Sequence, residues 1–336
     1  MKIAGYDTQA FPLLIAEIGN NHEGSYEVAC ELVKRAAESG AGAVKFQAFR
    51  SDYYVSRSDL ARHARLKSFE LSLDQFIKLG ELARKNGLLF IVTPFDLEIA
   101  RSLGQVVDSF KIASGDNDFL PLIDEVCKIE KPLIISTGLL DLKGVERLVK
   151  HVRHRREHLV NSTEFAILHC GCAYPVPSNE ANLLAIPSMQ YRLSCEVGYS
   201  DHTVGVEAAI AAVALGATII EKHFTLSKTY SDFRDHQLSA DPIELKQISE
   251  SIKRVAAMRG IGEKSIMPSE GENLAAVRRS IVAAKDLKEG HKIKDSDLTW
   301  IRISRGIAPG REAEIVGRDL LKDKTFGETI EFQDLK

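Results

Sequence analysis

The stretches CEVGYSDH (residues 195–202) and ATIIEKHF (residues 217–224) share one pattern: a short apolar run that ends in polar residues and a histidine. Short apolar runs joined by a helical stretch are typical of neighbouring strands in a parallel sheet. Because such strands end at the same edge, we expect His202 and His223 to face one site. Two neutral imidazoles, with positions left open for substrate and water, can hold a borderline divalent metal. Either histidine could instead be a hydrogen-bonded residue at the rim.

Similar apolar runs recur along the first three quarters of the chain and alternate with amphipathic stretches. The runs cover residues 13–19, 43–49, 89–95, 109–115, 133–138, 165–170, 195–201 and 217–224. Apolar residues follow the 3.6-residue period of a helix at 25–39, 73–86, 142–158 and 206–215, and a further helix is predicted at 242–259. Eight strands that alternate with helices are the number that closes a (βα)₈ TIM barrel.

The composition changes after the predicted barrel, to which we assign residues 1–262. Residues 263–278 are polar, with glycine, proline and charged side chains, and are interpreted as a linker. From 279 to 336 the pattern becomes one of short strands and turns, which predicts a second, β-rich domain. Because about sixty residues cannot build a large core, this domain is expected to pack against the barrel or against a partner chain.

Charge and cysteine content exclude several classes of function. The net charge of -3 gives no general electrostatic case for nucleic acid or an anionic membrane. A basic run at 150–158 lies in a predicted helix and is interpreted as a solvated face. The five cysteines are odd in number, which is typical of reduced thiols in a cytoplasmic protein. No leader or membrane-spanning stretch is recognisable, so no membrane partner is expected.

Lysines and hydroxyl groups stand at the predicted strand ends, where a barrel places its chemistry. Lys45 and Lys111 lie within apolar strands, and a buried ammonium group needs an anionic partner. Hydroxyl groups that could complete a phosphate or carboxylate pocket belong to Thr93, Ser114, Ser136 and Thr137. The pattern therefore favours an anion pocket, although each lysine could instead pair with a barrel carboxylate.

The order and spacing of many short motifs resemble the sialic acid synthase family of nonulosonic acid synthases. The motifs are AEIGNNH (16–22), VKFQ (44–47), TPF (93–95), FKIASGD (110–116), ISTG (135–138), LHC (168–170), YP (174–175), SDHT (200–203) and EKHFT (221–225). The match spans nearly the whole chain. The segment from 279 onwards resembles that family's antifreeze-like SAF domain, so the resemblance implies a TIM barrel followed by a β-clip SAF domain.

The resemblance implies an enzyme that condenses phosphoenolpyruvate with an open-chain N-acyl hexosamine. The products would be a nine-carbon 2-keto acid and phosphate, released by C–O cleavage. By the same resemblance, His202 and His223 would ligate Mn²⁺, with Mg²⁺ or Co²⁺ as alternatives, and the ion would polarise the sugar aldehyde. Side chains implied to bind substrate, chiefly phosphoenolpyruvate, are those of Lys45, Thr93, Lys111, Ser114, Ser136, Tyr174 and Ser200.

The resemblance also assigns four carboxylates. Glu17 and Asp235 would bind sugar hydroxyls, and Glu17 is also a candidate proton acceptor. Glu221 and Asp116 would steer water or the metal ligands. Each carboxylate could instead be one half of a supporting salt bridge.

In the family, the SAF domain of one subunit covers the active site of the other and contributes an arginine. Arg302 occupies that position, which implies a homodimer with shared sites, and its guanidinium suits an acyl carbonyl or hydroxyl. The family's usual Arg-Pro-Gly turn reads Arg302-Ile303-Ser304 here. Arg302 could therefore instead be a surface arginine on an edge strand.

Three further departures from the family pattern lie in the implied pocket. Many members have Asn where this chain has Cys172, which affects a phosphoenolpyruvate contact. On the sugar side, the common Gly-Pro is replaced by Phe233 and Arg234, and a phenylalanine of the tail is replaced by Arg278. The changes suggest a sugar other than N-acetylmannosamine, either a diamino sugar or a phosphorylated hexosamine. Two rival readings stay open: an aldolase that forms a Schiff base at Lys111, and a non-catalytic carbohydrate- or ice-binding protein.

Overall fold

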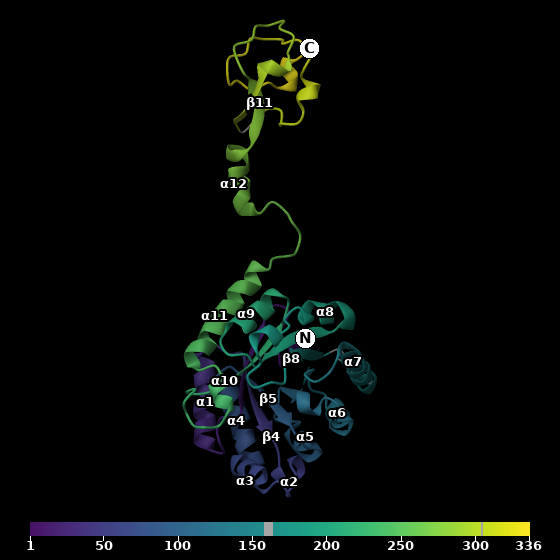
Figure 1. Cartoon of the computed structure of the whole chain (residues 1–336), viewed down its shortest axis with the longest axis vertical. Helices are drawn as coiled ribbons and strands as arrows, with labels where there is room; N and C mark the ends of the chain where they lie inside the picture. Colours follow the sequence, from purple (N-terminus) through teal and green to yellow (C-terminus); the bar gives the residue numbers. More distant parts are fainter. Residues whose placement is uncertain (158–163, 304) are drawn as a thin grey trace. The chain divides into compact units, whose positions relative to one another are not determined.

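The computed structural model describes residues 1–157, 164–303 and 305–336 (Figure 1). The chain divides into two compact units, Met1–Gly260 and Ile261–Lys336, and each is described by itself. Within the described residues, no helix has both the length and the apolar character needed to cross a bilayer.

The first unit is a closed barrel of eight parallel strands in the order β10-β3-β4-β5-β6-β7-β8-β9. Their bounds are β3 Leu13–Gly19, β4 Ala43–Ala48, β5 Leu89–Pro94, β6 Ser109–Ile112, β7 Leu133–Ser136, β8 Phe165–Cys170, β9 Glu196–Asp201 and β10 Ile219–His223. Each strand falls within one of the eight apolar runs, so the predicted TIM barrel is confirmed. The runs are continuous because parallel barrel strands are covered on both faces.

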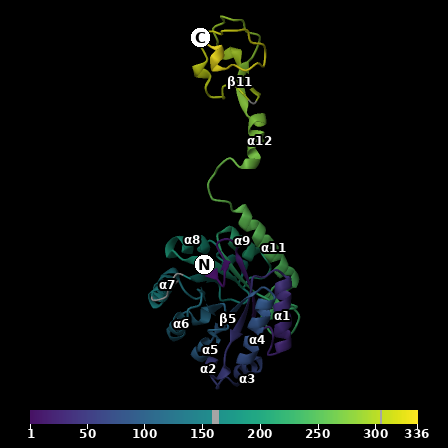
Figure 2. The same cartoon turned by 180° about the vertical axis from the view of Figure 1, so that it is seen from behind.

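A ring of helices surrounds the strands (Figure 2). The ring consists of α1 Tyr26–Glu38, α4 Leu73–Lys85, α5 Leu97–Leu103, α6 Leu120–Cys127, α7 Leu142–Arg156, α8 Ala185–Leu193, α9 Glu207–Ala214 and α11 Pro242–Met258. Short helices α2 Ser51–Tyr54, α3 Leu60–Phe69 and α10 Asp235–Leu238 follow β4 and β10. The predicted helix 142–158 corresponds to α7, and its predicted last residue, His158, lies outside the described residues.

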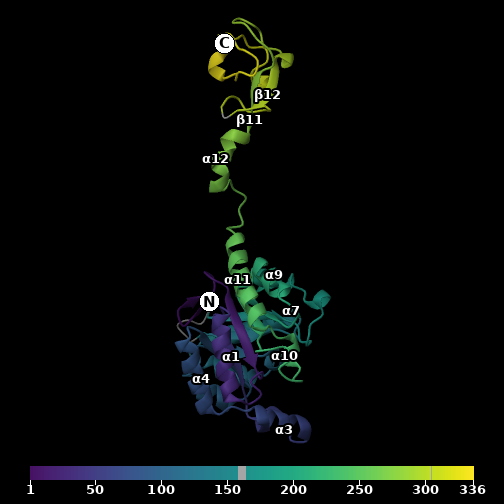
Figure 3. The same ribbon diagram turned by 90° about the vertical axis from the view of Figure 1, so that its left-hand side faces the viewer.

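Local signals explain where these helices begin. Helix α4 starts after Ser72, whose hydroxyl accepts from the backbone of Gln75 while the Gln75 side chain accepts from the backbone of Ser72. Asp241 caps α11, and Pro242 occupies its first turn. Helices α1, α4 and α11 lie along one side of the barrel (Figure 3), with α1 packed against the other two.

The barrel interior changes character from its amino end to its carboxyl end. A hairpin of β1 Lys2–Ile3 and β2 Tyr6–Asp7 precedes the barrel. Ile3 packs with an apolar layer inside the amino end, which contains Leu13, Ile15, Ile91, Ala166, Leu168 and Ile219. The interior of the other half carries charged and hydroxyl side chains, so the apolar layer forms the floor beneath the candidate site.

Gly198 in β9 is the position where strand packing leaves least room. A Cβ atom there would lie 2.4 Å from the carbonyl oxygen of Ile219 and 2.5 Å from a methyl carbon of Leu168. We expect Gly198→Ala to lower the free energy of unfolding by about 1–3 kcal/mol, because neither neighbour can move without disturbing the barrel. Urea unfolding measures the change. The control is Gly115→Ala, where a Cβ would meet nothing within 4 Å; equal losses in both variants would contradict the packing argument.

The second unit is built around its own small core. Strands β11 Arg279–Ala283 and β12 Leu298–Arg302 pair antiparallel, and Ile281, Leu298, Ile315 and Ile330 are among the residues of the core. Three short 3₁₀ helices complete it: η3 Asp295–Asp297, η4 Glu312–Glu314 and η5 Phe332–Asp334. Helix α12, Pro268–Val277, precedes β11 and occupies most of the segment that the composition predicted as a linker.

Candidate active site

Two lysines and two glutamates meet inside the carboxyl half of the barrel, and all four are buried. The Nζ atom of Lys45 (β4) lies 3.0 Å from Oε2 of Glu17 (β3) and 3.6 Å from Oε1 of Glu221 (β10). The Nζ atom of Lys111 (β6) lies 3.8 Å from Oε2 of Glu221. Both ammonium groups therefore face a shared centre, and the predicted pairing of each lysine with a barrel carboxylate is also present.

Hydroxyl groups surround this charged cluster. Lys45 donates to the hydroxyl of Thr93 at 3.2 Å, and Lys111 donates to the hydroxyl of Ser136 at 2.6 Å. Ser200 (β9) donates to Glu221 at 3.0 Å. Ser114, in the 3₁₀ helix η1 Ser114–Asp116, accepts from the backbone N–H of Gly138 at 3.1 Å. The structure thus brings the hydroxyl groups of Thr93, Ser114, Ser136 and Ser200 to one end of the barrel. The predicted hydroxyl of Thr137 instead donates to the backbone oxygen of Leu168 at 2.9 Å.

Burial and pairing shift the protonation of these groups in different directions. Burial lowers the pKa of Lys111, and Glu221 offsets only part of the effect. Burial acts on Lys45 too, but Glu17 and Glu221 outweigh it and raise its pKa. Burial raises the pKa of Glu17, whereas for Glu221 it is outweighed by Lys111 and Lys45, which lower the pKa. These shifts favour the charged forms of Lys45 and Glu221 and the neutral forms of Lys111 and Glu17.

The two predicted metal ligands face each other. The ring centroids of His202 and His223 are 5.3 Å apart, and Tyr174 packs against both rings at 4.3 and 6.1 Å. The carbonyl oxygen of Gly171 lies 2.7 Å from Nδ1 of His202, so Nδ1 carries a proton and Nε2 is the nitrogen that can bind a metal when the ring is neutral. Burial lowers the pKa of His202, but Cys170 and the Gly171 carbonyl outweigh it and raise the pKa.

The histidine pair fits a divalent ion. Among the described residues, Nδ1 of His223 is buried and has no hydrogen-bond partner. Burial, with added repulsion from His202, places the pKa of His223 well below its usual range, so this imidazole is neutral and can act as a ligand. No cluster of three or more His, Cys, Asp or Glu side chains suited to a metal occurs in the described ranges. The protein would thus supply two imidazoles and leave the other positions to water or substrate.

Tyr174 connects the histidines to the residues that follow β10. The guanidinium of Arg234 lies over the Tyr174 ring at 4.9 Å and pairs with Asp235 at 3.4 Å. The Phe233 ring packs edge-on against Phe69 of α3 at 5.3 Å. Asp235 is thus connected to the histidine pair through Arg234 and Tyr174, while Phe233 forms an aromatic contact with α3.

Asp116, at the end of η1, carries an unsatisfied carboxylate oxygen. Its Oδ2 is buried and has no hydrogen-bond partner among the residues that the structure describes. Burial, with a smaller contribution from Asp118, raises the pKa of Asp116 to about 6. An unpaired carboxyl group that titrates near neutrality is suited to handling a proton or orienting water.

We expect Asp116→Asn to stabilise the protein above pH 6. The raised pKa means that stability is fully present below the ordinary value of 3.8 and is lost as the pH rises towards about 6. The amide variant has no charge to bury, so its Tm should equal the wild-type Tm near pH 3.5 and exceed it at pH 7. Thermal unfolding across this pH range measures the difference, and Asp118→Asn, which removes only the repulsion, should give a smaller gain. A constant difference at all pH values would contradict the assignment.

Arg302 is the last residue of β12 in the second unit, where its side chain is exposed. It is the one predicted site residue that belongs to that unit. Ser304, the last residue of the altered turn, lies outside the described residues.

Two groups in the site were not assigned a role from the sequence. Gln47 donates to Glu17 at 3.3 Å and accepts from Asn20 at 2.9 Å. The signal for Gln47 was present, because residues two apart on a strand share a face and Lys45 is its neighbour on that face. Cys172 lies beside η1, with its sulfur where a Cβ on Gly138 would stand. Its thiol therefore borders the hydroxyl of Ser114.

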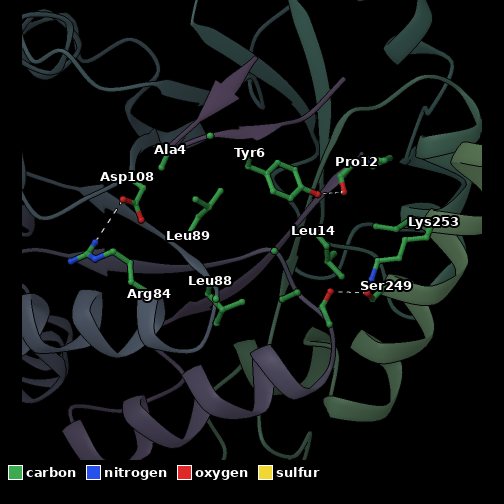
Figure 4. A pocket seen from close by; sticks show the side chains of 16 residues that line it. Ala4, Tyr6, Pro12, Leu14, Arg84, Leu88, Leu89, Asp108, Ser249 and Lys253 are labelled. Carbon is green, nitrogen blue, oxygen red and sulfur yellow. Dashed lines mark hydrogen bonds and ion pairs between the residues drawn. The ribbon is translucent and has the colours of Figure 1, made fainter. Parts of the chain in front are cut away.

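A separate hollow of 630 Å³ lies at the amino end of the barrel (Figure 4). Tyr6, whose hydroxyl donates to Pro12, borders it together with Lys253, and Arg84 lies 3.7 Å from Asp108 at its edge. None of the described residues predicted to carry the chemistry lines this hollow. It lies beyond the apolar floor and is not part of the candidate site.

Comparison with known proteins agrees with this geometry. Residues 32–264 match the model of the NeuB family, and residues 278–336 match the SAF domain. An N,N'-diacetyllegionaminic acid synthase from Campylobacter jejuni is 37% identical over 95% of this chain and 98% of its own. The N-acetylneuraminate-9-phosphate synthase of Homo sapiens is 30% identical over 94% of this chain and 90% of its own.

A solved structure supports the same assignment. The N-acetylneuraminic acid synthetase of Leptospira borgpetersenii, crystallised with citrate, superposes with a TM-score of 0.75 at 32% identity, covering 82% of this chain and 93% of its own. The predicted resemblance is thereby confirmed, and this chain belongs to the NeuB family of sialic acid synthase-like enzymes and ends in a SAF domain.

Proposed function

We propose that this enzyme condenses phosphoenolpyruvate with an open-chain N-acyl hexosamine and releases a nine-carbon 2-keto acid and phosphate. The observation that carries the proposal is the convergence of Lys45, Lys111, Glu221 and the His202–His223 pair at one end of the barrel. The names of the relatives support the same reaction class.

Charge balance supports a divalent ion in this reaction. When ionised, Lys45 and Lys111 are balanced by Glu17 and Glu221, so the cluster alone offers no net positive charge to a substrate with a phosphate and a carboxylate. An ion held by His202 and His223 would restore a net positive charge and would polarise the sugar aldehyde. We infer Mn²⁺ as the ion, with Mg²⁺ or Co²⁺ as alternatives.

The side chains then have distinct tasks. Lys45 and Lys111 would hold the phosphate and carboxylate of phosphoenolpyruvate by charge-assisted hydrogen bonds, helped by the hydroxyls of Thr93, Ser114, Ser136 and Ser200. The enol carbon forms the new C–C bond with the aldehyde carbon, and the aldehyde oxygen takes up a proton. Water adds at the resulting cationic carbon and loses a proton, for which Glu17 is suited by its raised pKa. The C–O bond to phosphate then breaks.

The other predicted residues complete the pocket in this proposal. Asp116 and Glu221 would orient water, while Tyr174 and Asp235 would contact the sugar. Arg302 would reach the acyl group of a sugar bound by the other subunit, in a homodimer where each SAF domain covers its partner's barrel. The five cysteines are all free, which supports a cytoplasmic location.

The test is phosphate release from phosphoenolpyruvate with a panel of sugars, with and without Mn²⁺. The panel contains N-acetylmannosamine, its 6-phosphate and a 2,4-diacetamido hexose. We expect release with at least one sugar in the presence of Mn²⁺ and none when the sugar is omitted. No release with any sugar, or equal release without metal, would overturn the proposal.

A second candidate, a Schiff-base aldolase, is favoured by one observation: burial lowers the pKa of Lys111, as a nucleophilic lysine requires. Borohydride reduction in the presence of pyruvate separates the two. An aldolase would gain a covalent adduct on the peptide that contains Lys111 and would keep its activity without metal. The synthase would show neither.

A further inference from the structure

Three arginines of the second unit line one hollow of 830 Å³. Arg278 and Arg279 lie at the junction of α12 and β11, and Arg302 lies at the end of β12. Ser280, Gly306 and the turn at Ala308–Pro309 form other parts of the wall, and Leu274 and Val277 contribute apolar surface. The hollow, which we call the arginine hollow, lies entirely within the second unit.

The backbone pairing brings two of these positive charges together. Arg279 and Arg302 are directly opposite in the antiparallel ladder of β11 and β12, so their side chains leave the same face of the ribbon. Like charges directly opposite on neighbouring strands destabilise a sheet. Arg279 donates to the backbone oxygen of Trp300 at 2.7 Å, which holds its guanidinium but does not neutralise it.

The arginine hollow differs from the rest of the unit in its lack of carboxylates. Elsewhere the unit pairs its cations with acids: Lys285 with Asp297, Lys288 with Asp323, Lys322 with Asp334 and Arg311 with Glu314. Among the residues whose side chains the structure describes, which do not include Glu272 of α12, no Asp or Glu lines the hollow and no ion pair involves Arg278, Arg279 or Arg302. The three guanidinium groups are exposed, and together they form a cationic surface that suits an anionic ligand.

We propose that the arginine hollow binds the phosphate monoester of a small organic molecule. Guanidinium forks bind phosphate oxygens in pairs, and a dianion would relieve the repulsion between Arg279 and Arg302. The hollow is larger than a bare phosphate needs, and Leu274, Val277 and Pro309 can cover an organic body beside the charged group.

Two kinds of ligand could supply this phosphate monoester. If the proposed reaction and homodimer hold, on which this case rests, the ester is the phosphate of a phosphorylated N-acyl hexosamine, and Arg302 would bind that phosphate instead of the acyl group. Otherwise it is a free phosphorylated metabolite that binds the second unit independently of the barrel. The site is the same in both cases, so it can be tested without turnover and without phosphoenolpyruvate.

The experiment is residue-resolved arginine modification of the full chain with phenylglyoxal, followed by peptide mapping. The ligands are N-acetylmannosamine 6-phosphate, inorganic phosphate and unphosphorylated N-acetylmannosamine, at constant ionic strength. We expect the sugar phosphate to slow modification of Arg278, Arg279 and Arg302 but not of Arg311. The candidate barrel site raises no ambiguity here, because its predicted anion ligands are lysines and hydroxyls.

Variants supply an independent readout of affinity. We expect Arg302→Gln to raise the Kd of the sugar phosphate by about tenfold, which is the usual consequence of losing one charge-assisted hydrogen bond. Arg311→Gln removes the same charge from the same unit outside the hollow and should keep wild-type affinity. Because Arg302→Gln also relieves repulsion, its Tm at low salt should not fall below that of the wild type, which separates lost binding from lost folding.

The outcomes are distinct. Protection by the sugar phosphate alone supports the ester and points to the substrate, and protection by inorganic phosphate as well supports a free phosphorylated ligand. Equal protection by the unphosphorylated sugar, protection of Arg311 to the same degree, or no protection would overturn the proposal. The proposal would also be overturned if the three arginines resisted modification before any ligand was added. None of these results depends on whether the barrel forms a 2-keto acid.

Discussion

Substitution of Lys111 by methionine should lower kcat/KM for phosphoenolpyruvate by about 10²- to 10³-fold, the range for loss of one preorganised donor in a closed site. Lys111 is buried, donates to Ser136 at 2.6 Å and faces Glu221 at 3.8 Å. Its ammonium group is one of the two cations that can meet the substrate's phosphate and carboxylate. Steady-state phosphate release, measured with the sugar that the panel identifies, gives the effect.

The stability of the same variant distinguishes a binding lysine from a structural one. Burial lowers the pKa of Lys111, so its charged form is held at a cost, and Glu221 keeps Lys45 at 3.6 Å when Lys111 is replaced; methionine should therefore cost little stability. The matched control is Lys222→Met. Lys222 is equally buried but pairs with the buried carboxylate of Asp201 at 2.8 Å. Removing it should cost about 3–5 kcal/mol, because Asp201 is left uncompensated.

The opposite pattern would contradict this assignment. If Lys111→Met unfolded at lower urea concentration than the wild type and kept its kcat/KM, Lys111 would be a structural ion-pair residue, as one reading of the sequence allows. If it lost activity and the wild type also gave a borohydride adduct at Lys111, the aldolase would replace the synthase.

The strands were predictable from sequence because each lies in a continuous apolar run, and the runs at 13–19 and 165–170 coincide with β3 and β8. The ring helices α5, α6 and α8 were not predicted. They have seven, eight and nine residues, and helices this short give only a weak apolar period, although α9, also of eight residues, was predicted.

Helix α12 shows a different limit. Its side chains are largely exposed within its own unit, so it has no buried face to produce an apolar stripe, and its composition is that of a linker. The available signals were local: Pro268 in the first turn and Glu270, whose side chain bonds the backbone of Met267. Local capping signals alone are weak without a periodic pattern to support them.

The residue types of the candidate site were readable from sequence, but their partners were not. That Glu17 lies beside β10 follows from barrel closure, which pairs His223 with Glu17 across the first and last strands. Which carboxylate meets which lysine depends on strand stagger, and one sequence does not contain that register. The unpaired oxygen of Asp116 is likewise a property of the folded loop.

Removal of the metal should have the other large effect. We expect chelation to lower the rate of phosphate release at least roughly 10³-fold. The reason is that polarisation of a carbonyl by a bound ion lowers the activation barrier by several kcal/mol. Mn²⁺ should restore activity to the chelated wild type. His202→Ala and His223→Ala should lose both the activity and the bound metal, since each removes one of two imidazoles whose rings are 5.3 Å apart.

Metal content supplies a readout that does not depend on activity. Elemental analysis and the Mn²⁺ paramagnetic resonance signal should show one ion per chain in the wild type and almost none in either variant. His236→Gln is the matched control, because His236 is also buried but its ring nitrogens lie 2.7 Å from the Thr225 hydroxyl and 2.9 Å from Glu23. It should keep its metal.

A full metal complement in His202→Ala would contradict the two-imidazole site, and the ion would then have to be held by carboxylates such as Glu221. Retained activity after chelation would be more serious for the proposed reaction. The buried charges of Lys45 and Lys111 would then have to bind the substrate against Glu17 and Glu221 with no further cation, and the charge balance that favours the synthase would no longer hold.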